Sequence, residues 1–504
     1  MKRITLASLL SAIGQCLLVS LLSCQPKSLT ILHTNDMHAG FLPHEAYWVQ
    51  TSPKPMVGGF NELSWMIDSL RKVHTTSILL DAGDVMTGTP ISEFVYDGYP
   101  GGALFQMMNT IGYDAWTIGN HDLDISQDNI RGLMGIAKFP TVSANLSDTT
   151  GKLAFGQKPF VIIDRGGAKI GIIGIMSSDL FRLTNTNNLH GLKVEPPVAI
   201  AQKYVDSLLP VTDLIIALTH EGVDEDSILA ASTHGINVII GGHSHTRLKS
   251  PKTINGVLVC QTGSNCENLG ELNLTFDHHV LLSSDGKLLP LWVRHQTSGL
   301  PVASLVENVQ KAVDKDYNVA IGSLAADWKR NSRGESNVGD FIADAIREAA
   351  QAQVGVTNSS GIRKDQPAGP VRKIDIFEVM PFRNIVCTFR ISGKSLREFA
   401  DRYMRTLIDG RSSIQVSGLT CLWKRVDGNP TILSLRLDGK DVVDNLTYIF
   451  STSDFVVDQG DKYLGFQPQN VEYTSKTVYQ AMVDKIMREK NVNSQIEDRF
   501  KEQN

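Results

Sequence analysis

The chain has 504 residues, of which 42% are hydrophobic and 20% are charged, enough for two or three domains with buried cores. Its formal net charge is −5, from 48 basic and 53 acidic residues, and no basic stripe interrupts the sequence. This balance argues against an extended surface for a nucleic-acid polymer.

The first residues predict export from the cell. Met1-Lys2-Arg3 precedes an apolar stretch that runs through Leu22 and ends at Ser23-Cys24, the layout of a bacterial secretion signal rather than of a membrane span. Residues 1–23 are therefore predicted to be a signal peptide. Cys24 resembles the lipid-modified cysteine of a lipobox, and cleavage without lipid is the alternative. We expect a periplasmic or outer-membrane lipoprotein attached to the membrane by this lipid.

Five short aliphatic runs in the first half of the chain each end at a polar motif. The runs are residues 29–32, 77–80, 115–118, 213–217 and 238–240, and the motifs are Asp36-Met37-His38, Gly83-Asp84, Gly119-Asn120-His121-Asp122, Thr219-His220 and Gly241-Gly242-His243-Ser244-His245. Amphipathic stretches such as residues 60–71 lie between them, which predicts alternating strands and helices of an α/β fold. Because ligands gather beyond the carboxyl ends of such strands, we expect the motifs to converge on one crevice.

The residue types in these motifs suit hard or borderline divalent cations. Carboxylate, imidazole and amide groups without thiolates bind Zn, Mn, Fe or Mg. Two cations roughly 3.5–4 Å apart can clamp a phosphoryl group and activate a water, and Asp84 is the predicted bridging carboxylate. One Gly-Asp pair or one histidine is usually structural, but five motifs in this order predict a dinuclear site that hydrolyses phosphate esters.

The motif order D-x-H, G-D, G-N-H-[DE], H and G-H-x-H resembles that of the calcineurin-like metallophosphoesterases. More closely, the segments 36–38, 119–124 and 241–245 resemble the two-domain 5′-nucleotidase family. The resemblance implies an N-terminal four-layer α/β/β/α sandwich over residues 24–298, a linker helix over residues 299–320, and a C-terminal α+β nucleotide-binding domain over residues 321–504. Residues 301–315 do show helical spacing of apolar side chains.

The same resemblance implies the metal ligands and the catalytic pair. One cation would be held by Asp36, His38 and His245, the other by Asn120, His220 and His243, with Asp84 bridging. The two ions would be Zn, Mn, Mg or Co. His121 would face the phosphate, and Asp124, three residues on, would orient its imidazole and raise its pKa. Asp122 is expected to be a supporting or capping group.

The second half of the chain supplies cations and aromatic rings that suit a nucleotide. Arginine can bind two phosphate oxygens at once, and aromatic rings can sandwich a base. Matching the family's C-terminal motifs implies the substrate-binding residues Arg333, Arg363, Phe382, Phe455 and Asp461. Arg330 could take the place of Arg333, and Asn358-Ser359-Ser360-Gly361 carries serines where the family has glycines.

Three further expectations concern the cysteines, the C-terminus and the substrate. Cys260 and Cys266 could form a disulfide, and free buried thiols are as compatible with the spacing. Residues 474–500 are expected to form an amphipathic helix. The predicted reaction is phosphate release from nucleoside 5′-monophosphates, and the alternatives are hydrolysis of UDP-sugars, dinucleotides or 2′,3′-cyclic nucleotides, or a silent surface-binding lipoprotein. The oligomeric state is not predicted.

Overall fold

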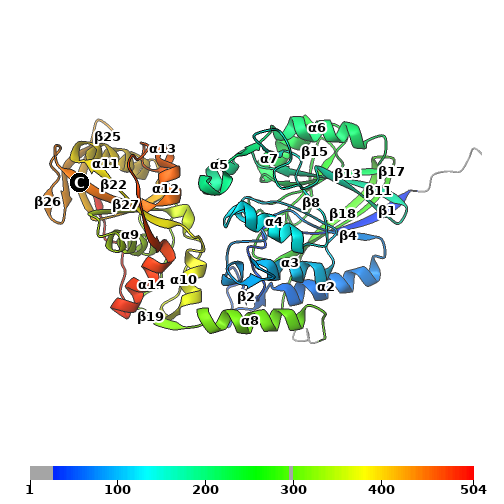
Figure 1. The fold of residues 1–504 in the computed structure, drawn as a ribbon, viewed down its shortest axis with the longest axis horizontal. Coiled ribbons are helices and arrows are strands. Elements are labelled where there is room, and N and C mark those ends of the chain that lie inside the picture. The colour runs from blue at the N-terminus through cyan, green and yellow to red at the C-terminus, as the bar shows by residue number, and fades with distance from the viewer. Residues whose placement is uncertain (1–25, 294–298, 504) are drawn as a thin grey trace, which may run out of the picture.

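A computed structural model describes residues 26–293 and 299–503, so the predicted signal peptide and Cys24 lie outside the described residues. The chain forms an N-terminal and a C-terminal body, and helix α8 (Ala303–Tyr317) runs along one side of the molecule between them (Figure 1). In the described ranges, no helix has the length and apolar character needed to cross a bilayer.

The N-terminal body is built on two six-stranded sheets. The first has the order β18 (Val280–Pro290), β17 (Asn268–Asp277), β1 (Lys27–Thr34), β4 (Ser77–Asp81), β7 (Ala115–Thr117) and β8 (Thr141–Val142). The second has the order β10 (Phe160–Arg165), β11 (Ala168–Met176), β13 (Leu214–His220), β14 (Val238–Ile240), β16 (Val257–Cys260) and β15 (Lys252–Ile254). In each sheet the strands that precede the polar motifs are parallel to one another, so their carboxyl ends meet at one edge.

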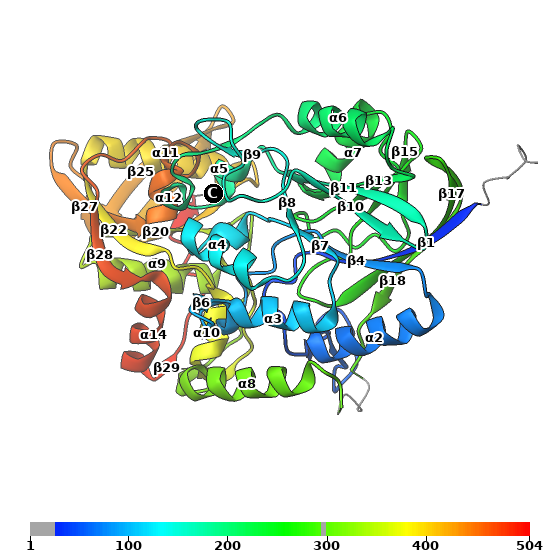
Figure 2. The ribbon, with the colours of Figure 1, turned by 45° about the vertical axis from the view of Figure 1, so that its right-hand side comes forward.

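Three apolar layers hold the two sheets and their helices together. Side chains such as Ile31 and Ile216 meet between the sheets, and each fully buried one contributes about 1.5–3 kcal/mol. The outer face of the first sheet packs on α2 (Phe60–Val73), α3 (Gly102–Ile111), α4 (Gln127–Ile136) and α8. The outer face of the second packs on α6 (Pro197–Leu208) and α7 (Val223–Ser232) (Figure 2). The predicted four-layer α/β/β/α sandwich is therefore confirmed.

The C-terminal body is a separate α+β unit with its own cores. Its sheets have the orders β23 (Ile414–Ser417), β20 (Val354–Asn358), β27 (Thr447–Ser453), β22 (Ile385–Ser392), β28 (Glu472–Thr477); β26 (Lys440–Asp441), β25 (Asn429–Leu437), β24 (Leu419–Val426), β30 (Phe500–Glu502); and β21 (Gly369–Arg372), β19 (Ala320–Leu324), β29 (Asn491–Val492). Its helices are α9 (Asn337–Ala349), α10 (Lys373–Val379), α11 (Gly393–Ile408), α12 (Asp454–Asp458), α13 (Gly460–Tyr463) and α14 (Val478–Glu489).

The expected long helix over residues 474–500 is wrong. Only Val478–Glu489 is helical; strand β28 precedes the helix, and strands β29 and β30 follow it. The Arg499 guanidinium donates to both carboxylate oxygens of Asp344 at 2.9 Å and to the carbonyl of Val416 at 2.7 Å. These tertiary contacts stabilise an extended tail in place of a helix. These partners are far away in the sequence, so local spacing could not indicate them.

Candidate active site

The loops after strands β1 and β4 form one connected platform. The N–H of Asp36 donates to the carbonyl of Gly83 at 2.9 Å, and the N–H of His38 donates to the carbonyl of Asp84 at 3.0 Å. The side chain of Asp84 in turn accepts the N–H of His121, from the loop after β7, at 2.7 Å. Three motifs separated in the sequence are thus joined by hydrogen bonds before any ligand is considered.

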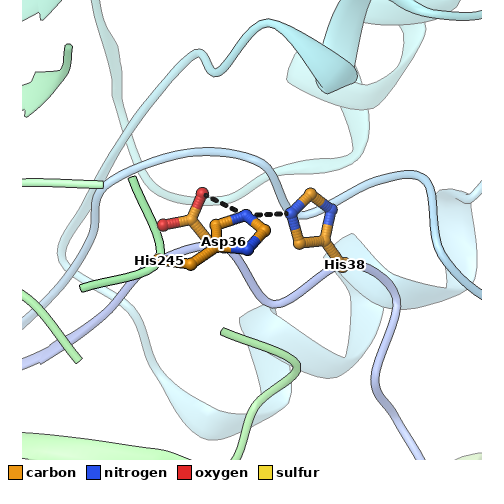
Figure 3. Close-up of side chains that lie close together, drawn as sticks. All are labelled: Asp36, His38 and His245. Carbon is orange, nitrogen blue, oxygen red and sulfur yellow. Dashed lines mark hydrogen bonds and ion pairs between the residues drawn. The ribbon is translucent and has the colours of Figure 1, made fainter. Parts of the chain in front are cut away.

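Asp36, His38 and His245 form the first cluster that could hold a cation (Figure 3). The Nε2 atoms of the two histidines are 2.9 Å apart, and His245 Nε2 lies 3.6 Å from Asp36 Oδ1. His38 Nδ1 lies 2.8 Å from the carbonyl of Thr87; because a carbonyl only accepts, Nδ1 carries the proton and Nε2 presents its lone pair. This is the tautomer that a metal ligand requires.

Asp84, His220 and His243 form the second such cluster. His220 Nδ1 donates to the carbonyl of Ala82 at 2.7 Å, and its buried Nε2 lies 3.1 Å from Asp84 Oδ2. His243 Nδ1 lies 2.9 Å from Asn120 Oδ1, so the predicted amide ligand borders the same cluster.

His220 Nε2 and Asp84 Oδ2 lie 3.1 Å apart, so a positive charge between them would remove the repulsion between a nitrogen lone pair and a carboxylate oxygen. Burial opposes a charged imidazole at His220, but Asp84 and Asp36 outweigh it and raise its pKa to about 10. A proton or a cation can therefore occupy this position. The donor set, two carboxylates and four imidazoles with a nearby amide, fits divalent cations of the Zn or Mn type.

Five of the seven predicted metal ligands have a left-handed backbone. The φ angles are 48° at Asp36, 46° at His38, 56° at Asp84, 77° at His243 and 54° at His245. Such conformations cost non-glycine residues free energy and concentrate at functional sites, where the surrounding structure enforces them. Here they turn successive side chains of tight loops toward the same point.

Two glycines keep the loops close enough for this arrangement. A Cβ atom added to Gly119 would collide with Asp84 Oδ1, and one added to Gly83 would come within 2.9 Å of His220 Nδ1. Gly83 also has a φ of 87°, a conformation that favours glycine. The Gly-Asp and Gly-Asn motifs are therefore close approaches of the backbone rather than ordinary turns.

His121 and Asp124 form a hydrogen-bonded pair at the edge of the two clusters. His121 Nδ1 lies 2.7 Å from Asp124 Oδ2, within the 3₁₀ turn η2 (His121–Leu123) and its C-terminal cap. Burial opposes the charged imidazole, but Asp124 and Asp84 outweigh it, so the pKa of His121 is raised. Because a carboxylate only accepts, Nδ1 holds the proton in the neutral ring, and Nε2 is the reactive nitrogen.

Asp122 binds the loops together without joining either cluster. Its carboxylate accepts the N–H groups of Gly119 at 2.8 Å and of Asp84 and Met86 at 3.0 Å each. Burial and the negative charge of Asp84 raise its pKa, and the N–H groups of Gly119 and Met86 act in the opposite direction. The structure thus gives Asp122 a supporting position, as the sequence predicted.

The C-terminal body brings Arg363 and Phe382 to the clusters. The Phe382 ring lies 5.6 Å from the His121 ring, centroid to centroid, and the Arg363 guanidinium carbon lies 5.9 Å from the centre of the Phe382 ring. Burial lowers the pKa of Arg363, while Asp84 and Asp124 act in the opposite direction, and arginine stays charged in proteins. The Phe382 ring thus lies beside His121, and the positive charge of Arg363 lies beside the Phe382 ring.

The other three predicted binding residues lie apart from this contact. The rings of Phe455 and Tyr463 lie 6.0 Å apart, centroid to centroid, in one core of the C-terminal body. Arg333 is exposed. Arg330 instead donates to the carbonyl of Arg363 at 2.7 Å, so it braces the loop that carries Arg363.

Asp461 lines a separate cleft of about 620 Å³ between the two bodies. The cleft is lined by α5 (Leu180–Leu183) with Asp179, and by residues of α12 and α13 with Gln467. It contains none of the predicted metal ligands, so its size does not identify the reaction site.

Two buried amides that support the motifs have no signal in the sequence. Asn35 donates to Asp36 Oδ2 at 2.6 Å, and Gln261 donates to the carbonyl of Gly242 at 2.7 Å and accepts from Ser244 at 2.9 Å. Both are buried polar residues beside a motif, but a lone amide has no spacing pattern that separates it from a structural one. The four cysteines at 260, 266, 387 and 421 are free and buried.

Two family models match this chain, one in each of its two bodies. Residues 29–247 match the model of the calcineurin-like phosphoesterases, and residues 316–467 match that of the 5′-nucleotidase C-terminal domain. A 5′-nucleotidase from Vibrio parahaemolyticus is 26% identical over 90% of each chain. The trifunctional nucleotide phosphoesterase YfkN from Bacillus subtilis is 27% identical over 94% of this chain, which spans 35% of that protein.

Solved structures show the same two-body fold. The 5′-nucleotidase precursor from Thermus thermophilus superposes with a TM-score of 0.78 at 26% identity, covering 95% of this chain and all of that one. The Thermus thermophilus sulfate thiohydrolase SoxB superposes with a TM-score of 0.73 at 15% identity, over 94% of this chain and 96% of that one. The second likeness shows the fold alone, so the fold by itself does not select the substrate.

Proposed function

Since this chain belongs to the two-domain 5′-nucleotidase family and is a metallophosphoesterase, we propose that it releases phosphate from nucleoside 5′-monophosphates. The observation that supports this substrate is the contact of Phe382 with His121. It joins an aromatic ring from the C-terminal body to the clusters that could hold the metals.

The two clusters would hold two divalent cations. Asp36, His38 and His245 would bind one, and His220, His243 and Asn120 the other, with Asp84 between them. When bound, such cations polarise the phosphate oxygens and lower the pKa of water, so that it can attack phosphorus.

The protein's own side chains would orient the phosphate and stabilise its charge. Arg363 would donate two N–H groups to phosphate oxygens. The hydrogen bond between Asp124 and His121 Nδ1 would leave Nε2 free to meet the phosphate. As the oxygen of water bonds to phosphorus, the bond to the 5′-oxygen breaks. A protonated His121 would stabilise the developing charge or give its proton to that leaving oxygen.

The base and ribose would be bound by the C-terminal body. Phe382 and Phe455 pack on different cores of this body, and each would offer a ring face to the base. Stacking on such rings is worth about 1–3 kcal/mol per base in single-stranded nucleic-acid sites. Asp461 and Arg333 would contact substrate only after a change in the arrangement of the bodies, which α8 would permit as a hinge.

The reaction is tested by phosphate release from AMP. The purified mature chain is stripped of metal and reloaded with Zn, Mn, Mg or Co, and it is compared with His121→Ala and with His234→Ala, an exposed histidine that serves as the matched control. We expect metal-dependent release that His121→Ala loses and His234→Ala keeps. Equal activity of the two variants would contradict the assignment of His121.

Product analysis tests the choice of substrate. UDP-glucose, a dinucleotide and 2′,3′-cyclic AMP are offered beside AMP under the same metal. The Ser359-Ser360 segment differs from the family's glycines, and Ser360 lies within hydrogen-bonding distance of Asn358 at 2.9 Å and of Tyr463 at 3.3 Å. Faster turnover of any of the three than of AMP would overturn the monophosphate assignment and leave the hydrolase assignment intact.

We also propose that the chain is exported and lipid-anchored through Cys24. The support is the sequence of residues 1–24 alone. Mass spectrometry of the mature protein tests it: a diacylated N-terminal cysteine is expected, and an unmodified N-terminus would exclude the anchor.

A further inference from the structure

We propose that Thr87 is a positioning residue that couples the catalytic pair to the first metal cluster. Its hydroxyl group orients Asp124, and its carbonyl group orients His38. The inference rests on the proposed dinuclear hydrolase function and extends it to a residue outside the recognisable motifs.

The hydroxyl of Thr87 lies beside the carboxylate that holds His121. Thr87 Oγ1 donates to Asp124 Oδ2 at 2.9 Å, the same oxygen that lies 2.7 Å from His121 Nδ1. The hydroxyl has one proton, and the alternative acceptor, the carbonyl of His121, is farther away at 3.3 Å. The carboxylate therefore receives two hydrogen bonds on one oxygen, which fixes its rotation about the side chain.

The carbonyl of the same residue lies beside a predicted metal ligand. Thr87 O is 2.8 Å from His38 Nδ1, compared with 3.3 Å for the carbonyl of Met86. The protonated Nδ1 must face this acceptor, and so His38 Nε2 is directed toward Asp36 and His245. One residue thus sets the tautomer of the ligand and the orientation of the catalytic carboxylate.

The backbone of Thr87 is held in a conformation that its residue type disfavours. Its φ is 61°, an uncommon value for a β-branched residue, and its N–H donates to the hydroxyl of Ser92 at 3.0 Å. The residue is only 6% exposed. Strain of this kind persists where the surrounding contacts enforce it, and it is concentrated at functional sites.

These contacts predict which part of catalysis depends on the hydroxyl. Valine at position 87 has nearly the same shape and keeps the carbonyl, so the His38 orientation and both metals should remain. Without the hydroxyl, the Asp124 carboxylate can rotate, and it then no longer holds the His121 ring in one orientation. Removing such a supporting hydrogen bond lowers activity by about 10-fold to 100-fold in comparable metal sites.

The experiment compares Thr87→Val, Thr87→Ser and Thr89→Val. Thr89 is the matched control because its hydroxyl, in the same loop, donates to the backbone carbonyl of Ala39 at 2.8 Å and not to a carboxylate. We expect Thr87→Val to lower kcat by about 10-fold or more with KM and metal content unchanged. Thr87→Ser should restore most of the activity, and Thr89→Val should resemble the parent.

A double-mutant cycle and a spectroscopic measurement separate positioning from general damage. If Thr87 acts through Asp124, Thr87→Val should cause no further loss in an Asp124→Asn background. The proton resonance of His121 Nδ1, identified by its absence in His121→Ala, should shift in Thr87→Val and not in Thr89→Val.

The outcomes distinguish this proposal from the proposed function. An unshifted resonance, or a Thr87→Ser variant as impaired as Thr87→Val, would overturn the assignment of Thr87. A parent chain that releases no phosphate from AMP would overturn the substrate instead. The resonance, measured without substrate, would still decide whether Thr87 positions the pair.

Discussion

Burial decides the charge of several imidazoles at the candidate site. It lowers the pKa of His243 to about 4 and that of His245 to about 3, and it lowers the pKa of His38 well below the usual value. At neutral pH these three rings are uncharged and keep a lone pair for a cation. Each residue can therefore serve as a ligand without first releasing a proton.

Asp122 provides a test of the support beneath the site. Asn at this position has one acceptor oxygen, and its NH₂ group would face at least one of the N–H groups of Asp84, Gly119 and Met86. A buried donor left without a partner costs about 1–3 kcal/mol. We expect calorimetry of Asp122→Asn to show a melting temperature lower by several degrees, together with reduced metal content.

The control for this variant is Asp128→Asn. Asp128 lies on the exposed side of α4, with a side chain that is 93% exposed and paired with Arg131, and such pairs contribute little. Equal melting temperatures and metal contents for the two variants would show that the three hydrogen bonds of Asp122 do not hold the loops.

The secondary-structure elements at the site could largely be predicted from the sequence. The run at residues 238–240 coincides with β14, and the expected helix at residues 301–315 is observed at Ala303–Tyr317. These elements follow from local spacing. Thr87, Gln261 and the tail around Arg499 could not be predicted, because their partners lie in other elements and their residue types are common in any loop.

One ion pair joins elements of the two bodies. Arg383 Nε lies 2.7 and 2.9 Å from the two carboxylate oxygens of Glu93, and its Nη2 also contacts Glu93. Because the Arg383 side chain is 47% exposed, the pair should contribute at most about 1 kcal/mol. It can bias the arrangement of the bodies but cannot fix it.

Arg383→Ala should therefore shift the balance between arrangements without abolishing activity. We expect KM to rise by up to about 5-fold, since 1.4 kcal/mol corresponds to tenfold, and the radius of gyration by X-ray scattering to increase slightly. Arg436→Ala removes a pair with Asp441 within the C-terminal body and serves as the control. A rise in KM that is larger for Arg436→Ala than for Arg383→Ala would show that the Arg383–Glu93 pair does not restrain the two bodies.

At the scale of the whole molecule, the two bodies also meet through α12. Asn185 donates to Asp454 Oδ2 at 2.9 Å, and Thr186 donates to Asp458 Oδ2 through its N–H and its hydroxyl. In Figures 1 and 2, α5 of the N-terminal body lies beside α12. Polar contacts of this kind can be exchanged for water, so they would permit the C-terminal body to turn.

Locking this contact tests the need for such a turn. The double substitution Asn185→Cys with Asp454→Cys places two thiols where the side chains now touch. Oxidation should abolish turnover and reduction should restore it. The two single variants, oxidised in the same way, are the controls. Full turnover of the oxidised double variant, with the disulfide verified by mass spectrometry, would exclude the rotation.

Asp454 should make the stability of the folded chain depend on pH. Burial raises its pKa to about 6, against the opposing hydrogen bonds from Phe455, Ile385 and Asn185. The folded chain therefore binds this proton more tightly than the unfolded chain. The stabilisation is complete below about pH 4 and is lost as the pH rises through 6, a change on the order of 3 kcal/mol.

Asp454→Asn should remove this part of the pH dependence. Between pH 4.5 and 7.5, we expect the melting temperature of the parent to fall by several degrees relative to that of the variant. Parallel curves for the two proteins over this range would show that Asp454 does not titrate there.

The most direct test of a dinuclear phosphohydrolase is a metal titration of the stripped chain. Bound Mn²⁺ and phosphate release from AMP are measured on the same samples as the cation is added. The two clusters are adjacent, with Asp84 Oδ2 of the second lying 3.9 Å from His38 Nε2 of the first. A dinuclear site therefore predicts that release follows the second equivalent and reaches its maximum at two ions per chain. Maximal release with one ion, or release without any, would exclude a dinuclear mechanism.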